Sequence, residues 1–428
     1  MVDVIKINLW GKELGALSWD TDLNFGSFEF FNDFLSQQLD VSPLHMPIKS
    51  SKGKIYNFPS LNEETYKGLP GMLSDVLPDD FGNTLIDQWL VLNSIKRSDF
   101  SPLDRLLYIG KRGMGALEFE PARKLGYDSA SIIKVDKLVE LSKMILTKRE
   151  KLSLTIEQTE ELNELIKVGT SAGGQRAKAI ICYNQKTKEI RSGQGAVPKG
   201  FEHYLLKFDG VTNEELGDLT GYGRIEYAYY LMAVDCGIDM MPSELLEENG
   251  RAHFMTKRFD RIGNNEKLHM QTLCSMAHFD YKKPGVYGYE DAFDVMRKLS
   301  LPQSDAIKLF KRIVFNVAAR NQDDHTKNIS FLMDKRGKWH LSPAYDMTYA
   351  YNPSGIWTNN HQMTINGKRD NITLEDLLMV GDKINYKKSK EEIDRISKVI
   401  SNWNIYADKA GIPKQQAAKL FKAFRCNF

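Results

Sequence analysis

Residues 321–328 read NQDDHTKN, and this stretch decides the fold. It lies inside the run FNVAARNQDDHTKNISFLMD, between two apolar segments where a buried core would normally be built. Six of its eight side chains can bind a metal, hold a phosphate or move a proton. A capped loop that only joins a helix to a strand has little use for so many polar groups. The stretch therefore predicts a reactive site.

The order of residues in this stretch fits phosphate transfer. In protein kinases an aspartate orients the acceptor hydroxyl and takes its proton, and an asparagine later in the loop holds magnesium. Asp323 and Asn328 stand in that order. A second acid is needed for the metal, and Asp346 lies 18 residues beyond Asn328, after the strand-like runs FLMD and WHLSP. A hairpin would return it beside Asn328, and both residues offer the hard oxygens that Mg²⁺ prefers.

Three features upstream fit a nucleotide site, and each has a plain alternative. SAGGQRAKA, residues 171–179, offers glycine N–H groups and two cations to a phosphate, although a Gly-Gly pair alone is more often a turn. Lys207 ends the apolar run HYLLK, and Glu226 follows on a helix. These two either form the phosphate-positioning pair of a kinase or are unconnected surface charges. Phe259, in MTKRFDR, is either part of a hinge beside adenine or a core aromatic.

The order of these features along the chain is stronger than any one of them. A glycine loop, a strand lysine, a helix glutamate, a hinge, a catalytic loop, a hairpin and a metal aspartate follow one another as in a protein kinase. We therefore expect an α+β fold that is two-lobed and protein-kinase-like, with an N-terminal α/β subdomain and a helical C-terminal lobe. The expected units are residues 1–125, an N-lobe with the glycine loop and hinge at 126–260, and a C-lobe with the catalytic loop at 261–428.

Local patterns predict the individual elements. Apolar alternation or short apolar runs predict strands at Val4–Trp10 and in AKAIICYN, HYLLKFD, SELLEE and AHFMTKRFD. Helical periodicity predicts helices in VDKLVELSKMIL, IEQTEELNELI and RIEYAYYLMAVDCGI, with Gly237 as the cap of the last. SFEFFNDFLSQQL, residues 27–39, is also predicted to be an amphipathic helix.

The composition is that of an ordinary globular protein. The chain has 428 residues, of which 42% are hydrophobic and 27% charged, and its net charge of +2 is too small to indicate nucleic-acid binding by the whole chain. From Lys383 onward there are eleven Lys or Arg and four Asp or Glu, or +7. This excess indicates either a basic face or a solvated, lysine-rich helix surface. Four separated cysteines, no signal-peptide pattern and no long apolar run favour a cytoplasmic protein without membrane contact.

Several of these stretches resemble the HipA family, the kinase toxins of bacterial HipBA toxin–antitoxin systems. WGKELGALSWD resembles the family's N-terminal opening, and GLPGMLSDVLPDDFGN resembles its LPG…DSLPD…G segment. SAGGQRAKA resembles S-x-G-G-x-R-P-K, FNVAARNQDDHTKN resembles FN…N-x-D-D-H-x-K-N, and LSPAYDM resembles L-[ST]-P-A-Y-D. HQMTINGKRDNIT resembles a segment after the metal aspartate. The similarity runs over nearly the whole length.

The resemblance implies an ATP-dependent protein serine/threonine kinase that acts as the toxin of a toxin–antitoxin module. Asp323 would be catalytic, Asn328 and Asp346 would bind Mg²⁺, Glu226 would pair with Lys207, and Ser171 would be the autophosphorylation site. A HipB-like antitoxin would be the partner, with DNA contacted only through that complex. The implied ATP-binding residues are Gly173, Gly174, Gln175, Arg176, Ala177, Lys178, Lys207, Lys257, Arg258, Phe259, His325, Lys327, Asn328, Tyr345 and Asp346.

Two departures from the family pattern leave the catalytic groups in place. Ala177 replaces the common proline of the glycine loop, and Lys257 stands at a hinge position that is acidic in some members. Two other functions remain open. One is a catalytically weak kinase-like module that binds an antitoxin–DNA complex, which the retained Lys207 and Asp323 argue against. The other is a metal-dependent phosphoesterase, which would have no use for a strand lysine and a hinge.

Overall fold

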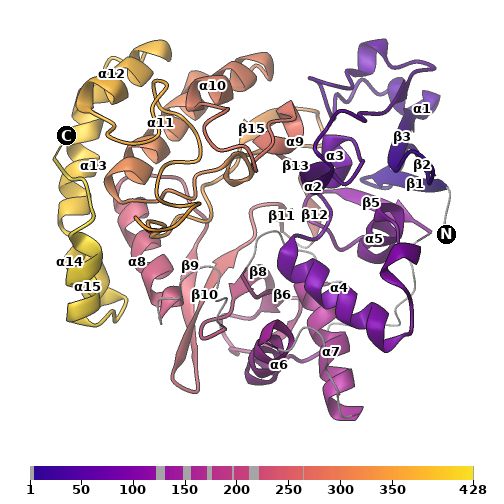
Figure 1. Ribbon diagram of the computed structural model, residues 1–428, viewed down its shortest axis with the longest axis horizontal. Helices are drawn as coiled ribbons and strands as arrows, with labels where there is room; N and C mark the ends of the chain where they lie inside the picture. The colour runs from indigo at the N-terminus through magenta and orange to yellow at the C-terminus, as the bar shows by residue number, and fades with distance from the viewer. Residues whose placement is uncertain are drawn as a thin grey trace.

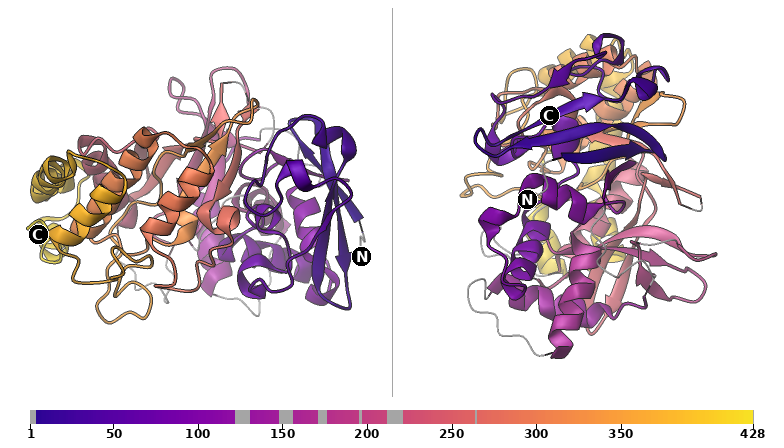
Figure 2. Two further views of the ribbon diagram at one scale, coloured as in Figure 1. Left: turned by 90° about the horizontal axis from the view of Figure 1, so that it is seen from above. Right: turned by 90° about the vertical axis from the view of Figure 1, so that its right-hand side faces the viewer.

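A computed structural model describes residues 4–121, 131–147, 156–170, 176–194, 197–211, 221–263 and 265–427. The N-terminal sheet and the C-terminal helices lie at opposite ends of the molecule, and a second sheet lies between and below them (Figure 1). The view from above shows the same separation (Figure 2). This mixed helix-and-sheet, two-lobed architecture agrees with the predicted fold class.

An antiparallel sheet in the order β4-β3-β2-β1-β5 begins the chain. Its strands are β1 (Val4–Leu9), β2 (Lys12–Asp20), β3 (Phe25–Phe30), β4 (Ile55–Tyr56) and β5 (Leu117–Glu120). The turn between β1 and β2 uses Trp10 and Gly11 with φ values of 52° and 74°, the positive values that a tight hairpin requires. Ile5, Ile7 and Leu9 are buried, so the alternation predicted for β1 is confirmed.

The helix predicted over residues 27–39 is wrong in its first half. β3 pairs with β2 in a register that sets Phe28 opposite Leu17, and the short helix α1 (Asn32–Leu35) follows. Phe28 and Phe30 are buried from the strand and Phe34 from the helix. Aromatic residues at these positions satisfy both a period of two and a period near 3.6, and pairing with β2 decides between them.

The rest of this N-terminal unit is mostly helical. Its elements are η1 (Ile48–Ser50), α2 (Glu63–Tyr66), α3 (Gly71–Ser74), α4 (Asp80–Leu92), η2 (Arg97–Asp99) and α5 (Pro102–Ile109). α5 begins with a capping box, in which Ser101 and Asp104 bond each other's backbone N–H groups. Leu85 and Ile86 of α4 share a hydrophobic core with the N-lobe, so the N-terminal unit is built into that lobe.

The N-lobe holds a second antiparallel sheet in the order β7-β6-β8-β10-β9. Its elements are α6 (Val135–Thr147), α7 (Ile156–Gly169), β6 (Lys178–Tyr183), β7 (Ile190–Ser192), β8 (Glu202–Lys207), α8 (Tyr222–Asp235), β9 (Ser243–Glu248) and β10 (Arg251–Lys257). The strands and helices predicted here are confirmed. Gly237 follows the last residues of α8 with φ +63°, as expected of a glycine that ends a helix. The register sets Lys207 between Lys178 and Phe254.

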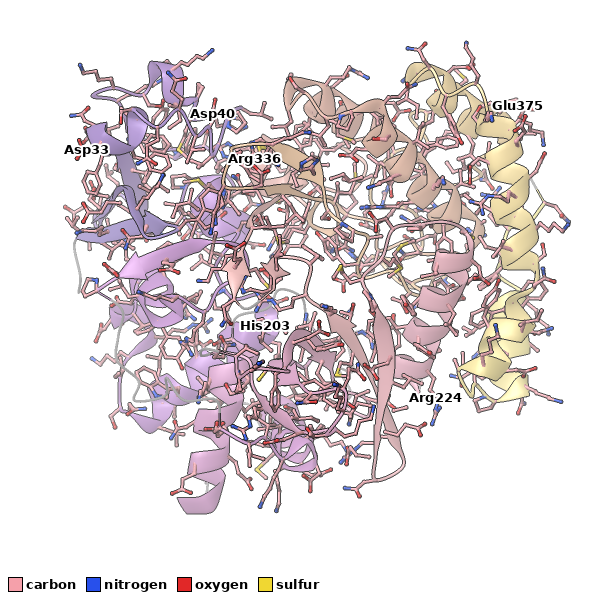
Figure 3. The ribbon with its side chains drawn as sticks, turned by 180° about the vertical axis from the view of Figure 1, so that it is seen from behind. Asp33, Asp40, His203, Arg224, Arg336 and Glu375 are labelled. Atoms are coloured by element: carbon pink, nitrogen blue, oxygen red, sulfur yellow. The ribbon has the colours of Figure 1, made fainter. Side chains whose placement is uncertain are left out.

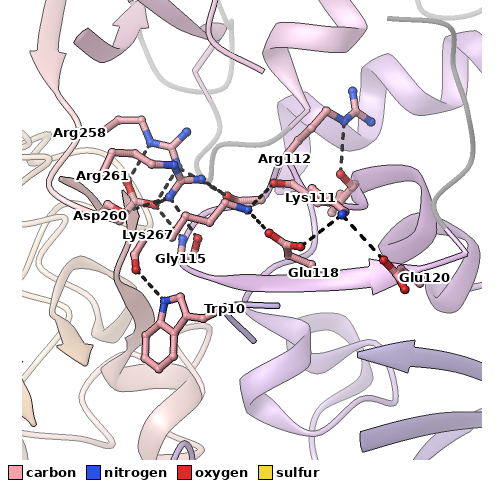
Figure 4. A network of polar contacts seen from close by, with 12 residues as sticks. Trp10, Lys111, Arg112, Gly115, Glu118, Glu120, Arg258, Asp260, Arg261 and Lys267 are labelled. Carbon is pink, nitrogen blue, oxygen red and sulfur yellow. Dashed lines mark hydrogen bonds and ion pairs between the residues drawn. The ribbon is translucent and has the colours of Figure 1, made fainter. Parts of the chain in front are cut away.

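A buried ionic network joins the N-terminal unit to the hinge (Figure 4). Asp260 accepts bonds of 2.7 Å from Arg258, from Arg261 and from the backbone N–H of Gly115. Short strands β11 (Arg261–Ile262) and β12 (Glu266–Lys267) follow. Because Gly115 precedes β5, this one carboxylate fixes the N-terminal sheet against the chain that leaves the N-lobe.

The C-lobe is helical around a small sheet, β13-β14-β15. Its elements are β13 (His269–Thr272), α9 (Leu273–Ala277), α10 (Tyr289–Lys298), α11 (Gln303–Ala318), η4 (Thr326–Asn328), β14 (Ser330–Met333), β15 (Trp339–Leu341), α12 (Leu374–Lys383), α13 (Ser389–Ser401), α14 (Trp403–Lys409) and α15 (Lys414–Phe421). The predicted hairpin after the polar loop is β14–β15. Arg224, near the start of α8 and labelled in Figure 3, joins the lobes by donating to the carbonyl of Ala410, and it also donates to Glu247 of β9.

Candidate functional site

The lobes enclose a cavity of about 990 Å³. Its walls come from the segment before α4, the N-lobe sheet, the hinge, the polar loop after α11, and the end of the chain around α15. Most of the predicted site residues within the described ranges line it, namely Arg176, Lys178, Lys207, Glu226, Lys257, Arg258, Phe259, Asp323, His325, Lys327, Asn328, Tyr345 and Asp346. Segments up to about 170 residues apart in the sequence therefore meet where the sequence patterns predict one site.

Lys207, at the end of β8, lies between two carboxylates. Its Nζ is 2.5 Å from Oε1 of Glu226 on α8 and also forms an ion pair with Asp346. Burial would lower the pKa of Lys207, but Asp346 and Glu226 outweigh it and raise that pKa. Burial would likewise raise the pKa of Asp346, but Lys207 and Lys178 hold it at about 2. Lys207 and Asp346 are therefore both charged at neutral pH.

The polar loop holds Asp323 by its backbone and by its side chain. Asn328 donates from Nδ2 to the carbonyl of Asp323 at 2.7 Å, and Trp357 donates from Nε1 to its Oδ1 at 2.6 Å. His325 places Nε2 3.7 Å from the same Oδ1. Burial in the cavity raises the pKa of Asp323, and His325 and Trp357 partly oppose that rise. The carboxylate is thus fixed in direction and more basic than an ordinary aspartate.

Lys327 faces the N-terminal unit. Its Nζ lies 2.8 Å from Oδ1 of Asp79 and 4.9 Å from the ring centroid of Tyr281. Its carbonyl accepts a 2.6 Å bond from the hydroxyl of Tyr345. Burial would lower the pKa of Lys327, but Asp79 and Tyr281 raise it overall. The catalytic-type loop is therefore in contact with a segment that the sequence places in a separate unit.

Asp324 has no role in the sequence patterns, and the structure gives it a structural one. Its carboxylate is 1% exposed. It accepts bonds from the hydroxyl of Tyr289, from the backbone N–H of Gln362 and, at 2.8 Å, contacts Nδ1 of His361. Asp324 thereby joins the polar loop to α10 and to the segment at residues 361–362, while its neighbour Asp323 faces the cavity.

The hinge residues line the cavity, although their polar groups have partners within the protein. The backbone N–H groups of Lys257 and Arg258 donate to the carbonyls of Pro242 and His203. Their side chains pair with Glu202 and Asp260. Phe259 lies 5.5 Å from the ring of Tyr345, centroid to centroid. A planar base would therefore meet aromatic and aliphatic surface here, and the two N–H groups are already used.

Part of the predicted glycine loop lies outside the described residues, namely Ser171, Gly173, Gly174 and Gln175. Arg176 follows with its guanidinium 3.0 Å from the ring centroid of Tyr222 on α8. Ala177 is buried, is not among the cavity-lining residues, and accepts a backbone bond from Phe208. Burial lowers the pKa of Lys178 to about 8, against the opposing effect of Asp346.

Some residues of the site were not predicted. Asp79 comes from GLPGMLSDVLPDDFGN, a stretch that carries the family resemblance but no recognisable chemistry, and Trp357 comes from an irregular segment with no periodic signal. Four cations on the C-lobe side of the cavity were also missed; three of them belong to the stretch whose charge excess the sequence shows after Lys383, and Arg320 had no such signal. They are Arg320, Lys419, Lys422 and Arg425.

The fold and the cavity define a two-lobed, kinase-like protein. The family model described as HipA-like C-terminal domain matches residues 170–425, and the one described as HipA N-terminal domain matches residues 5–120. The chain belongs to the HipA family, which confirms the resemblance drawn from the sequence.

The chain is similar to known proteins in fold and in sequence. A chain of the solved structure described as the Shewanella oneidensis MR-1 toxin–antitoxin system HipA, HipB and operator DNA complex has 18% identity and a TM-score of 0.64, over 99% of this chain and 96% of that one. At this identity the likeness concerns the fold. The Sinorhizobium fredii (strain NBRC 101917 / NGR234) protein named Putative kinase Y4mE is 31% identical over 192 residues, 42% of this chain and 42% of that relative.

Within the described residues, no helix has the length and apolar character needed to cross a membrane.

Proposed function

We propose that this chain is an ATP-dependent protein serine/threonine kinase and the toxin of a toxin–antitoxin module. The observation that carries the proposal is the contact of Lys207 with both Glu226 and Asp346, in the cavity that Asp323 also lines. A strand lysine paired with a helix glutamate, beside an acid that follows a hairpin, is the arrangement that positions nucleotide phosphates and metal in kinases. Membership of the HipA family supports the same function.

In the proposed reaction Asp323 is the general base. The oxygen of a substrate serine or threonine forms a bond to the γ-phosphorus of ATP while the bond from that phosphorus to the β–γ bridging oxygen breaks. The hydroxyl proton passes to Asp323, and ADP leaves. The raised pKa of Asp323 favours this proton transfer, and the bond from Trp357 to Oδ1 leaves Oδ2 for the hydroxyl.

The donor set around Asn328 and Asp346 fits a magnesium ion. The side-chain nitrogen of Asn328 is bonded to the carbonyl of Asp323, so its oxygen is the atom left for a cation. The carboxylate of Asp346 is ionised, because its pKa is held at about 2. Both are hard oxygen ligands, and magnesium held by them would neutralise charge on the transferring phosphate.

The remaining residues divide between phosphates and base. We assign the glycine loop, Lys178, Lys207, His325 and Lys327 to the phosphates. The hinge segment 257–259 and Tyr345 are assigned to the adenine side. Ser171 is assigned as the autophosphorylation site, where a phosphate adds about two negative charges beside the glycines that would receive ATP and so disfavours the nucleotide.

Incubation with ATP radiolabelled at the γ-phosphate tests the proposal. Wild type should transfer label to protein, and Asp323→Ala should lose about 10²–10⁴-fold of that rate while its thermal unfolding stays unchanged. Ser171→Ala should lose self-labelling and keep activity toward an added protein. Free labelled phosphate without labelled protein would identify a hydrolase, and neither product would favour a binding module without turnover.

We also propose a HipB-like antitoxin as the partner. The related Shewanella chain was solved in a complex that contains HipB and operator DNA. Co-expression of this chain with a HipB-like protein should yield a complex that survives gel filtration, and operator DNA should bind the complex and not this chain alone. Binding of the free chain to operator DNA would contradict the indirect contact.

A further inference from the structure

The C-lobe side of the cavity is strongly basic. Four cations from the start of the polar loop and the end of the chain line it, and we call them the basic rim: Arg320, Lys419, Lys422 and Arg425. Lys419 and Lys422 are exposed, on α15 and just after it, and the two arginines are half-buried. Among the lining residues from position 349 onward that the structure describes, none is a carboxylate.

The two arginines of the basic rim are held at the turn that leads into the polar loop. Arg320 stands three residues before Asp323 and donates from Nε to the carbonyl of Ala423 at 2.8 Å. The backbone N–H of Arg425 donates to the carbonyl of Ala318 at 2.8 Å, so the end of the chain is bonded to both sides of the turn that leaves α11. The guanidinium of Arg320 also lies 4.5 Å from the ring centroid of Tyr351. These contacts hold Arg320 and Arg425 at the turn between α11 and the loop that carries the proposed base, and Lys419 and Lys422 line the same cavity.

Most of this positive charge has no counter-charge at the rim. Asp370 lies 3.7 Å from Arg320, a loose ion pair in which the aspartate is 43% exposed. Arg425 donates to the carbonyl of Ile372 and also interacts electrostatically with Asp370, so this one carboxylate faces both arginines. Within the described part of the chain, the ion pairs include neither Lys419 nor Lys422, in contrast to the many paired lysines elsewhere. Exposed cations gathered around a cavity attract an anionic ligand from a distance.

We infer that the basic rim binds acidic residues that flank the acceptor serine or threonine of a protein substrate. The inference rests on the proposed kinase function, because the acceptor hydroxyl must reach Asp323 and its flanking residues then meet the rim. Tyr349, Tyr351 and Trp357 also line the cavity and would pack against the peptide backbone. The substrate class is therefore an acidic polypeptide segment with one hydroxyl among carboxylates.

Peptide binding to the full chain without ATP tests this inference independently of turnover. Two fluorescent peptides share one serine, with either aspartates and glutamates or serines and glutamines around it, and anisotropy gives their Kd values. The acidic peptide should bind at least about fivefold tighter at low ionic strength, and the difference should shrink as salt is added. The double variant Lys419→Glu/Lys422→Glu should abolish the preference. Its matched control is Lys409→Glu/Lys414→Glu, which changes two lysines of the same segment outside the cavity and should keep it.

The outcomes separate the rim from the kinase proposal. Equal affinity for the two peptides, or equal loss of preference in both double variants, would contradict the inference that the basic rim binds acidic residues. Tighter binding of a single-stranded RNA oligonucleotide of the same charge would also overturn it, in favour of a nucleic-acid surface. Selective binding of the acidic peptide without any phosphoryl transfer would support the binding role of the basic rim and contradict the proposed kinase activity. Where transfer is measurable, rim variants should raise KM for the acidic peptide and leave KM for ATP unchanged.

Discussion

Asp323 and Asp346 line one cavity, yet their pKa values move in opposite directions. Lys207 and Lys178 hold the pKa of Asp346 at about 2 against the effect of burial. Among the residues that the structure describes, no lysine is in contact with Asp323, so burial prevails and its pKa is raised. Two carboxylates whose environments separate their pKa values are suited to different tasks. Here the ionised Asp346 suits a cation, and the more basic Asp323 suits a proton.

The hydrogen bond from Trp357 to Asp323 predicts a pH effect. The bond stabilises the ionised carboxylate and so lowers its pKa, which means that Trp357→Phe should raise it further. Because the proposed base acts when ionised, activity should fall as the pH drops through this pKa, and the variant should lose activity at a higher pH than wild type. The acid limb of the kcat/KM profile measures this shift.

Trp403→Phe is the control, since Trp403 is buried in the C-lobe and bonds Ala417 instead. Its acid limb should coincide with that of wild type. Coincidence of the Trp357→Phe and wild-type limbs would remove Asp323 as the group that sets the profile.

At the scale of elements, much of the fold could be predicted because single elements carry single periodicities. β6, β8, β9, β10 and α6 through α8 follow their patterns. The helix predicted over residues 27–39 was wrong in its first half because their aromatic spacing fits both the period of a strand and the period of a helix. The meeting of Lys207, Asp323 and Asp346 in one cavity could be predicted because their motifs follow one another along the chain in the order found in protein kinases. Lys327 could not be matched to Asp79, which is 248 residues away, since no local pattern encodes a contact between two units.

The polar loop and the segment at 361–362 depend on each other through Asp324. Asp324→Ala would leave the Tyr289 hydroxyl and the Gln362 N–H buried without their acceptor. Each such loss costs about 1–3 kcal/mol, so the free energy of unfolding should fall by roughly 3 kcal/mol in urea denaturation. Asp294→Ala, at an exposed ion pair on α10, should change it by less than about 0.5 kcal/mol. Equal stability of both variants would exclude a structural role for Asp324.

At the scale of the whole molecule, Asp260 joins the N-terminal unit to the hinge. Asp260→Asn would leave Arg258 and Arg261 buried without their counter-charge, which should cost about 3–5 kcal/mol in the free energy of unfolding. Burial would raise the pKa of Asp260, but the two arginines lower it overall. The stabilisation is therefore complete above the unfolded pKa of about 4 and is lost as the pH falls below it. Unfolding curves at neutral and acid pH should show the wild-type advantage narrowing; a constant gap would contradict this sign.

The contact of Asp79 with Lys327 predicts that the N-terminal unit supports catalysis. Lys327 is a proposed phosphate-binding residue, and the 2.8 Å ion pair holds its ammonium group from the N-terminal unit. Asp79→Asn keeps the shape and removes the charge, so kcat should fall about 10–100-fold, as for other partners that orient a reacting group. In a Lys327→Met background the same change should have no further effect, because the positioning acts through the lysine.

Glu64→Gln is the matched control, because Glu64 also forms an ion pair from the N-terminal unit to the C-lobe, at 3.1 Å to Lys282, but away from the cavity. Loss of that pair should leave kcat and KM for ATP unchanged. If Asp79 only docked the unit onto the lobes, Asp79→Asn would lower the unfolding temperature and leave kcat intact, and its effect would persist in the Lys327→Met background. A kcat effect confined to the chains that retain Lys327 would instead make the N-terminal unit part of the phosphate site.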